Sequence, residues 1–141
     1  MRGLMTAAVL VGACAVAGAA DTPLAAREEY KGRVSHELAR GVKDGYIAGP
    51  KAWAKLWKDW KMEGKLPAID WKKEMVLVVT SEGSTVTLSA KLGDKGDVKT
   101  ESVGTDDLRA DSVYVMIVVP SKGVKTINGK AAKFEKSPEE P

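Results

Sequence analysis

Hydrophobic residues recur along the chain with two different periods, and the period distinguishes one helix from several strands. Between 50 and 61, in PKAWAKLWKDWK, the apolar positions are three or four residues apart: Trp53, Leu56, Trp57 and Trp60. Lysines fill other faces, so the segment predicts an amphipathic helix whose tryptophan stripe packs on a core. Pro50 suits the first helical position, where its nitrogen needs no hydrogen bond, and Gly64 with Pro67 ends the helix.

Continuous or alternating apolar runs predict the strands. MVLVVT at 75–80 and SVYVMIVVP at 112–120 are continuous and rich in β-branched residues, which is typical of strands buried on both faces. Residues 85–92 alternate, and GDKGD then turns into another strand, so we expect a hairpin with one wet face. Asn128-Gly129 predicts a tight turn in a last hairpin at a sheet edge. Two shorter strands are expected before the helix, at 30–34 and 44–48.

These elements predict the α+β class. We expect a bent antiparallel sheet or partial barrel of five to seven strands, packed against one main tryptophan-rich helix. Without its first 20 residues the chain has 121, enough for one domain but too few for two. The predicted organisation is a signal peptide at 1–20, a flexible segment at 21–27, a single domain at 28–134 and a polar tail at 135–141.

The first 20 residues have the three parts of an export signal. Arg2 supplies the charge, residues 4–16 the apolar middle, and residues 17–20 the small side chains before the cleavage site. The apolar middle is shorter than the roughly 20 residues of a membrane-spanning helix. We therefore expect an exported protein, periplasmic or extracellular. Residues 11–14, VGAC, also resemble a lipobox, so the alternative is an envelope lipoprotein lipidated at Cys14.

Net charge and cysteine content limit the partners and the disulfides that we expect for the protein. Arg2 is the only charged residue of the signal, so the net charge falls from +3 to +2 on cleavage. Such a balance predicts no nucleic-acid partner, and membrane contact only through the signal or a lipid anchor. Cys14 is the only cysteine, so the mature chain has no internal disulfide. The oligomeric state stays open.

Candidate chemistry is sparse. His36 is the only histidine, which excludes sites built on several histidines or thiols, and no G-x-S-x-G motif accompanies a serine. The loop aspartates match no calcium-loop spacing and are interpreted as solvated turn residues: Asp94, Asp97, Asp106, Asp107 and Asp111. We expect no catalytic residue, metal or cofactor. A hydrolase that uses a carboxylate pair, such as Asp70 with Glu74, remains an alternative.

Three segments resemble the PrcB C-terminal domain family. They are GYIAGPKAWAKLW at 45–57, LPAIDWKKEMVLVV at 66–79 and YVMIVVP at 114–120, and the resemblance covers about residues 45 to 120. The family consists of bacterial envelope proteins and is named for a lipoprotein that associates with and stabilises a secreted protease complex. The resemblance implies an accessory or binding role and no catalytic residues. The chain departs from the pattern at 81–88, where SEGSTVTL replaces a Gly-Gly-Tyr-type strand start.

The leading hypothesis is therefore an exported, non-catalytic domain that binds or stabilises another envelope or secreted protein, such as a protease. A sheet edge could receive it by strand addition. Trp71, which lies outside the helix, and its neighbour Asp70 are the other candidate contact. The alternative is a small-ligand or glycan-binding module that uses the hollow of the sheet.

Overall fold

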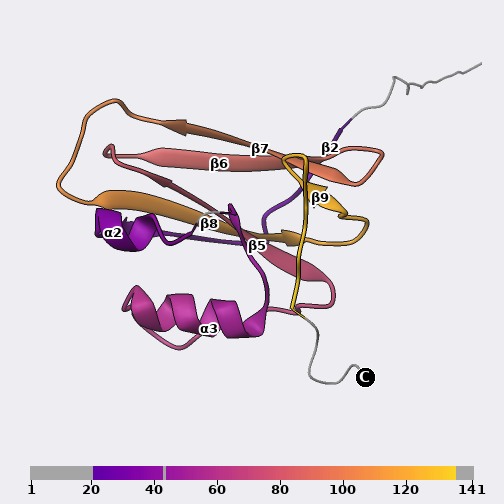
Figure 1. Ribbon diagram of the computed structural model, residues 1–141, viewed down its shortest axis with the longest axis horizontal. Helices are drawn as coiled ribbons and strands as arrows, with labels where there is room; N and C mark the ends of the chain where they lie inside the picture. Colours follow the sequence, from indigo (N-terminus) through magenta and orange to yellow (C-terminus); the bar gives the residue numbers. More distant parts are fainter. Residues whose placement is uncertain (1–20, 43, 136–141) are drawn as a thin grey trace, which may run out of the picture.

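The molecule consists of three layers, a five-stranded sheet, a four-stranded sheet and a layer of helix, stacked in that order (Figure 1). The structure is a computed structural model that describes residues 21–42 and 44–135. The predicted signal at 1–20, with the candidate lipidation site Cys14, and residues 136–141 of the predicted tail lie outside the described residues. The class is α+β, as predicted, with two helices and mostly strands.

The four-stranded sheet forms the middle layer. Its strands pair antiparallel in the order β3 (Glu28–Val34), β8 (Ser112–Pro120), β5 (Glu74–Ser81) and β4 (Tyr46–Ile47). The inner strands β5 and β8 are the two continuous apolar runs, and both are buried on both faces, as predicted. Along β5, Val76 and Val78 face the helix layer, whereas Met75 and Leu77 face the second sheet.

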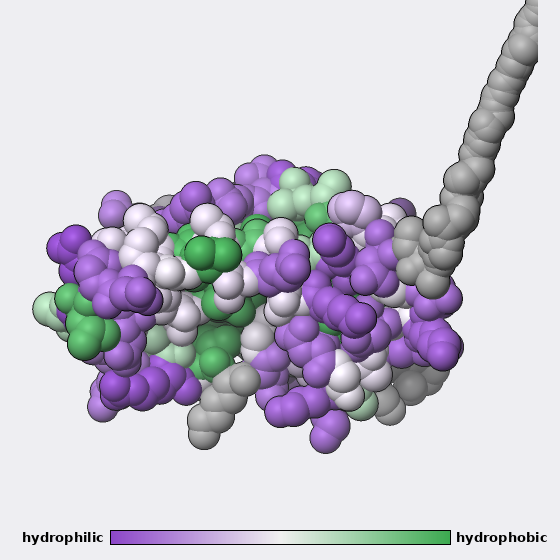
Figure 2. Space-filling model, turned by 90° about the horizontal axis from the view of Figure 1, so that it is seen from above, coloured by the Kyte–Doolittle hydropathy of each residue, from purple (hydrophilic) through white to green (hydrophobic). Residues whose placement is uncertain are grey.

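The five-stranded sheet forms an outer layer. Its order is β10 (Lys130–Ala131), β9 (Thr126–Ile127), β7 (Asp97–Gly104), β6 (Val86–Leu92) and β2 (Thr22–Pro23). Its pairs are antiparallel except that of β7 with β9, which is parallel. The β6–β7 hairpin has its predicted wet face, since Val86 and Ala90 are buried while Thr87 and Ser89 are exposed. Figure 2 shows the molecule from this side, mostly polar, with apolar residues gathered toward the middle.

Helix α3 (Pro50–Asp59) covers the other face of the four-stranded sheet (Figure 1). Pro50 stands at its start, and Trp53, Leu56 and the capping residue Trp60 are buried against the sheet. A second, short helix, α2 (His36–Ala39), follows β3 and was not predicted from the sequence. No helix among the described residues is long and apolar enough to cross a membrane.

The segment that follows α3 is tied back to the helix by two indole groups. Trp53 Nε1 donates to the carbonyl oxygen of Pro67 at 3.1 Å, and Trp57 Nε1 donates to that of Gly64 at 3.2 Å. Buried indole nitrogens usually need such a partner. These two tryptophans therefore hold the loop as well as filling the core.

The sheet is not closed into a partial barrel, which corrects the finer part of the fold prediction. The strands form two stacked sheets, and a second core lies between them. Met75 and Leu77 from β5 meet Ala90 from β6 and Val98 from β7 in this core. The physical reason is that β5 and β8 are apolar on both faces, so each face needs its own covering layer.

The N-terminal segment 21–27 contributes the short strand β2 to the five-stranded sheet. Thr22 and Pro23 pair with β6, and the Leu24 amide donates to the carbonyl oxygen of Ala90 at 2.9 Å. Arg27 then forms an ion pair with Glu74, with 2.6 Å between Nε and Oε2. These contacts are made with distant residues and leave no local pattern in the sequence.

The C-terminal end of the described residues is bonded to the start of α3. Glu135, predicted as the first residue of the tail, accepts hydrogen bonds from the backbone N–H groups of Lys51 at 2.9 Å and Ala52 at 3.0 Å. These amides open α3, whose N-cap residue Gly49 has no side chain to bond them. Glu135 therefore belongs to the folded domain and caps its main helix from a distance of more than eighty residues in sequence.

Candidate functional site

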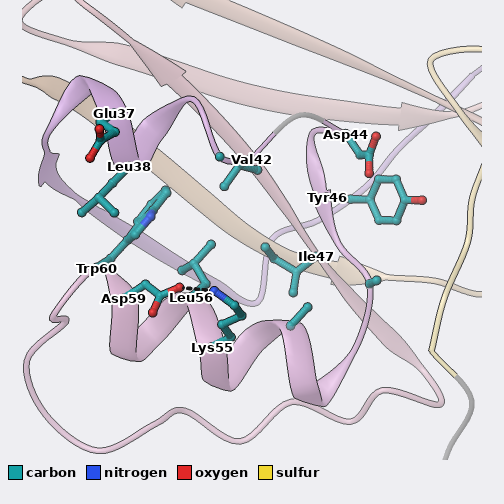
Figure 3. A pocket seen from close by; sticks show the side chains of 13 residues that line it. Glu37, Leu38, Val42, Asp44, Tyr46, Ile47, Lys55, Leu56, Asp59 and Trp60 are labelled. Carbon is teal, nitrogen blue, oxygen red and sulfur yellow. Dashed lines mark hydrogen bonds and ion pairs between the residues drawn. The ribbon is translucent and has the colours of Figure 1, made fainter.

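A groove opens between α2 and α3, and we name it the α2–α3 groove (Figure 3). Its volume is about 410 Å³. Apolar side chains from α2, from β4 with the chain before it, and from α3 line it: Leu38, Val42, Ile47, Leu56 and Trp60. In Figure 3, Leu38 and Trp60 lie at one end and Ile47 toward the other. One ten-residue helix does not cover the whole apolar face of the sheet, and the groove lies where that face stays uncovered beside α3.

The rim of the α2–α3 groove is acidic. The described lining residues include three carboxylates, those of Glu37, Asp44 and Asp59, and one ammonium, that of Lys55. Lys55 forms an ion pair with Asp59, with 2.6 Å between Nζ and Oδ2. The ammonium is thereby neutralised by a residue of its own helix. An apolar hollow under an acidic rim suits an apolar side chain that has basic neighbours.

A second groove lies on the other side of Trp60, which lines both. This β3–α3 groove has a volume of about 540 Å³ and runs between strand β3 and the end of α3. Four aromatic residues line it, Tyr30, Trp57, Trp60 and Tyr114, together with charged residues of β3 and of the segment that follows α3. The ring centres of Tyr30 and Trp57 are 6.0 Å apart in an edge-to-face arrangement, and those of Trp60 and Tyr114 are 5.0 Å apart.

Gly32 and Tyr114 form the floor of the β3–α3 groove. They lie directly opposite each other in the β3–β8 ladder, and a Cβ at Gly32 would lie only 2.5 Å from the tyrosine hydroxyl oxygen. The ring therefore extends across the glycine toward the open side of the sheet. Tyr114 is 7% exposed, and burial raises the pKa of its hydroxyl. Among the described residues, this hydroxyl has no hydrogen-bond partner.

His36 contacts Ser112, and a histidine in contact with a serine is the arrangement that activates a serine nucleophile. Its Nδ1 lies 2.6 Å from Ser112 Oγ, and its Nε2 lies 2.9 Å from the carbonyl oxygen of Arg109. The carbonyl can only accept, so Nε2 donates to it; in the neutral imidazole Nδ1 then accepts from the serine. Ser112 is 2% exposed and lines neither groove. The arrangement therefore ties α2 to β8 and offers no path for a substrate to a serine nucleophile.

The two contact residues chosen from the sequence, Asp70 and Trp71, lie in the turn before β5. Asp70 Oδ1 accepts from the Lys72 amide at 3.2 Å, and its carbonyl oxygen accepts from the amides of Lys73 and Glu74. Trp71 is partly buried and packs against the helix-side core. Neither residue lines either groove. The contacts of Asp70 form the turn, and Trp71 is neither fully exposed nor fully buried.

Asp70 and Glu74 do lie close together, but their contacts do not resemble those of a hydrolytic pair. Arg27 holds the Glu74 carboxylate with Nε at 2.6 Å and Nη2 at 3.1 Å, and the Asp70 amide donates to it at 3.2 Å. These donors lower the pKa of Glu74, with the Arg27 hydrogen bond as the largest cause. A general acid needs a raised pKa instead.

Two of the aspartates interpreted from the sequence as turn residues, Asp97 at the start of β7 and Asp107, act as acceptors for nearby donors. Hydrogen bonds from Thr126 and then from the Gly129 amide lower the pKa of Asp97. Hydrogen bonding with Thr105 and Ser84 lowers the pKa of Asp107 further below its usual range. Within the described residues, no group of three or more histidine, cysteine, aspartate or glutamate side chains could hold a metal ion.

Comparison of the chain with family models, with curated proteins and with solved structures gave no match. The site must therefore be interpreted from its own residues. The sequence analysis missed the α2–α3 groove because it did not predict α2. It missed the β3–α3 groove because that groove combines α3 with β3 and Tyr114, which are distant in sequence. One signal was available, since a glycine inside a strand, such as Gly32, often marks a place where another group approaches the backbone closely.

Proposed function

We propose that this protein is an exported, non-catalytic domain that binds or stabilises another envelope or secreted polypeptide. The observation that supports it best is the α2–α3 groove, with its apolar floor and acidic rim. We infer that the groove receives an apolar anchor side chain with lysine or arginine neighbours from the partner. The resemblance to the PrcB C-terminal domain family points to the same role, and a protease is one partner it suggests.

Groove geometry favours binding over catalysis. Leu38, Leu56 and Trp60 present apolar surface, and burying such surface drives most protein association. The Ser112–His36 contact is enclosed, and the carboxylate of Glu74 is engaged by Arg27. These two candidate groups are thus engaged in structural contacts, whereas the open apolar groove remains available.

The test is crosslinked affinity purification from the native cell envelope, with a tag after Pro141. Two arginine variants on the same helix provide the matched comparison. Ala52 lines the groove, so Ala52→Arg fills it and makes its rim less acidic, whereas Ala54→Arg adds the same charge at an exposed position outside the groove. One exported protein should be captured by the wild type and by Ala54→Arg, and lost with Ala52→Arg. Recovery of the domain alone would contradict the proposal.

Export itself can be tested on the same native material. Cleavage after Ala20 leaves a mature chain that begins at Asp21, whereas lipobox processing leaves a chain that begins at a lipidated Cys14. An intact-mass spectrum separates the two forms. We expect the unmodified chain from Asp21, and a mass that retains the unprocessed first 20 residues would contradict export.

A further inference from the structure

The open edge of the four-stranded sheet lies beside the β3–α3 groove. Strand β3 ends the sheet order, and its only strand neighbour among the described residues is β8. Edge strands present backbone N–H and C=O groups that can pair with an added strand. The groove beside this edge can receive alternate side chains of the added strand. This arrangement combines the two requirements of recognition by strand addition.

The register identifies which backbone groups point outward. The Ser121 amide donates to the carbonyl oxygen of Lys73 at 2.8 Å, so odd-numbered residues exchange the hydrogen bonds between β8 and β5. Backbone groups alternate in direction along a strand. Even-numbered residues of β8 therefore bond to even-numbered residues of β3. The N–H and C=O groups of Glu29, Lys31 and Arg33 then point to the open edge.

Tyr114 supplies a polar group at the floor of the groove. Its side chain is more than nine-tenths buried, yet its hydroxyl extends over Gly32 into the groove without a partner among the described residues. The hydroxyl itself is open to the groove, so it can exchange a hydrogen bond with a group bound there. The hydroxyl lies beside the edge that an added strand would occupy, where it could bond to that strand.

We propose that an extended segment of the partner polypeptide adds to β3 as a fifth strand of this sheet. The inference rests on the proposed function, because it names how the partner binds. The segment pairs its backbone with Glu29, Lys31 and Arg33. Alternate side chains enter the β3–α3 groove, where Tyr30 and Trp57 favour apolar or aromatic residues. The other side chains point to the opposite face of the sheet, beside the charged side chains of Glu29 and Lys31.

Random linear peptides displayed on phage, selected on the exported form of the protein, are the probe. We expect selected peptides to carry apolar residues at alternate positions. Bound peptide should slow amide hydrogen exchange at Glu29, Lys31 and Arg33, while Tyr30 and Gly32 are protected already in the free protein. Protection confined to residues of the α2–α3 groove would overturn the inference. So would selection of no peptide, or binding only of glycans on an oligosaccharide array.

Two variants separate backbone pairing from other effects. Lys31→Pro removes the lysine side chain and one outward backbone N–H group. Lys31→Ala removes the same side chain but keeps that N–H group. We expect selected peptides to bind Lys31→Pro about tenfold more weakly than Lys31→Ala, the effect of one lost hydrogen bond. Tyr114→Phe, which lacks only the hydroxyl, should weaken binding about fivefold. Equal affinities for all three variants would overturn the inference.

The outcome is distinguishable from failure of the proposed function. If native partner capture is lost with Ala52→Arg but unchanged with Lys31→Pro, the protein binds a partner and strand addition is wrong. A dimer that forms without peptide and protects the same β3 amides would show a second copy on the edge, which also overturns the inference. Both readouts use the intact exported protein.

Discussion

The two faces of the four-stranded sheet differ in how completely they are covered. The face toward the second sheet is closed over by aliphatic residues such as Leu77, Ile117 and Val119. The face toward the helices is covered largely by aromatic residues, and grooves of about 410 and 540 Å³ flank α3. A sheet of matching size covers its neighbour, whereas one ten-residue helix does not. Under the proposed function, the first face mainly provides stability and the second provides the binding surface.

The largest expected loss of stability comes from the same Leu→Ala substitution on each face of the four-stranded sheet. Leu77→Ala removes a fully buried side chain between the sheets and should destabilise the fold by about 3 kcal/mol, since the cavity is closed. Leu56→Ala removes a side chain that borders the α2–α3 groove and should cost about 2 kcal/mol, because water can enter the space. Urea denaturation measures both. A larger cost for Leu56→Ala would contradict the comparison.

A second prediction concerns the tie between α2 and β8. His36→Ala removes both contacts of the imidazole and leaves the buried Ser112 hydroxyl without this partner. We expect a loss of about 2 kcal/mol in the free energy of unfolding. Ser112→Ala in the same background should recover part of it, because the unpaired hydroxyl is then gone. If the double variant is less stable than His36→Ala, the assigned role of this contact is wrong.

The third prediction concerns the cap of α3. Glu135→Ala leaves the Lys51 and Ala52 amides without their acceptor and should cost about 1 kcal/mol. Glu135→Gln keeps one acceptor oxygen and should cost about half as much. Lys133→Ala is the control, because only its backbone amide bonds, to the Tyr46 hydroxyl. Equal unfolding midpoints for Glu135→Ala and Lys133→Ala would contradict the capping role.

The smallest effect is a pH dependence from the Arg27–Glu74 pair. Because Arg27 lowers the pKa of Glu74, the pair contributes stability above the usual glutamate pKa of about 4.3. That contribution is lost as the pH falls below this value toward the lowered pKa in the folded state. Glu74→Gln should therefore lose stability less steeply on acidification. Denaturation curves at neutral and acidic pH measure the slopes, and identical slopes would exclude this role for the pair.

Sequence reasoning was successful where a signal is local and periodic. The apolar runs that became β5 and β8 are continuous, and the alternation in β6 is regular, so their burial could be predicted from side-chain spacing. The stacking of two sheets could not, because it depends on which strands share an edge. Trp71 was chosen because it lies outside the predicted helix, with Asp70 as its neighbour. The α2–α3 groove depends instead on the unpredicted helix α2, and the β3–α3 groove depends on β3 and Tyr114, which are distant from α3 in sequence.

Glu135 and Tyr114 show the same limit on a smaller scale. Nothing in the sequence near Glu135 indicates that it caps a helix more than eighty residues earlier. Likewise, the position of the Tyr114 ring over Gly32 depends on the register of β3 with β8. Contacts that require a register or a long loop closure are not encoded in any short window of sequence.

The central claim, that the helix side binds the partner, can be tested by crosslinking mass spectrometry of the captured complex. Lysines are exposed on both sides, with Lys51, Lys55 and Lys58 on α3 and Lys91 and Lys99 on the five-stranded sheet. We predict that lysine-reactive crosslinks to the partner start from the α3 lysines. Crosslinks confined to Lys91 and Lys99 would place the partner on the opposite face and contradict the account.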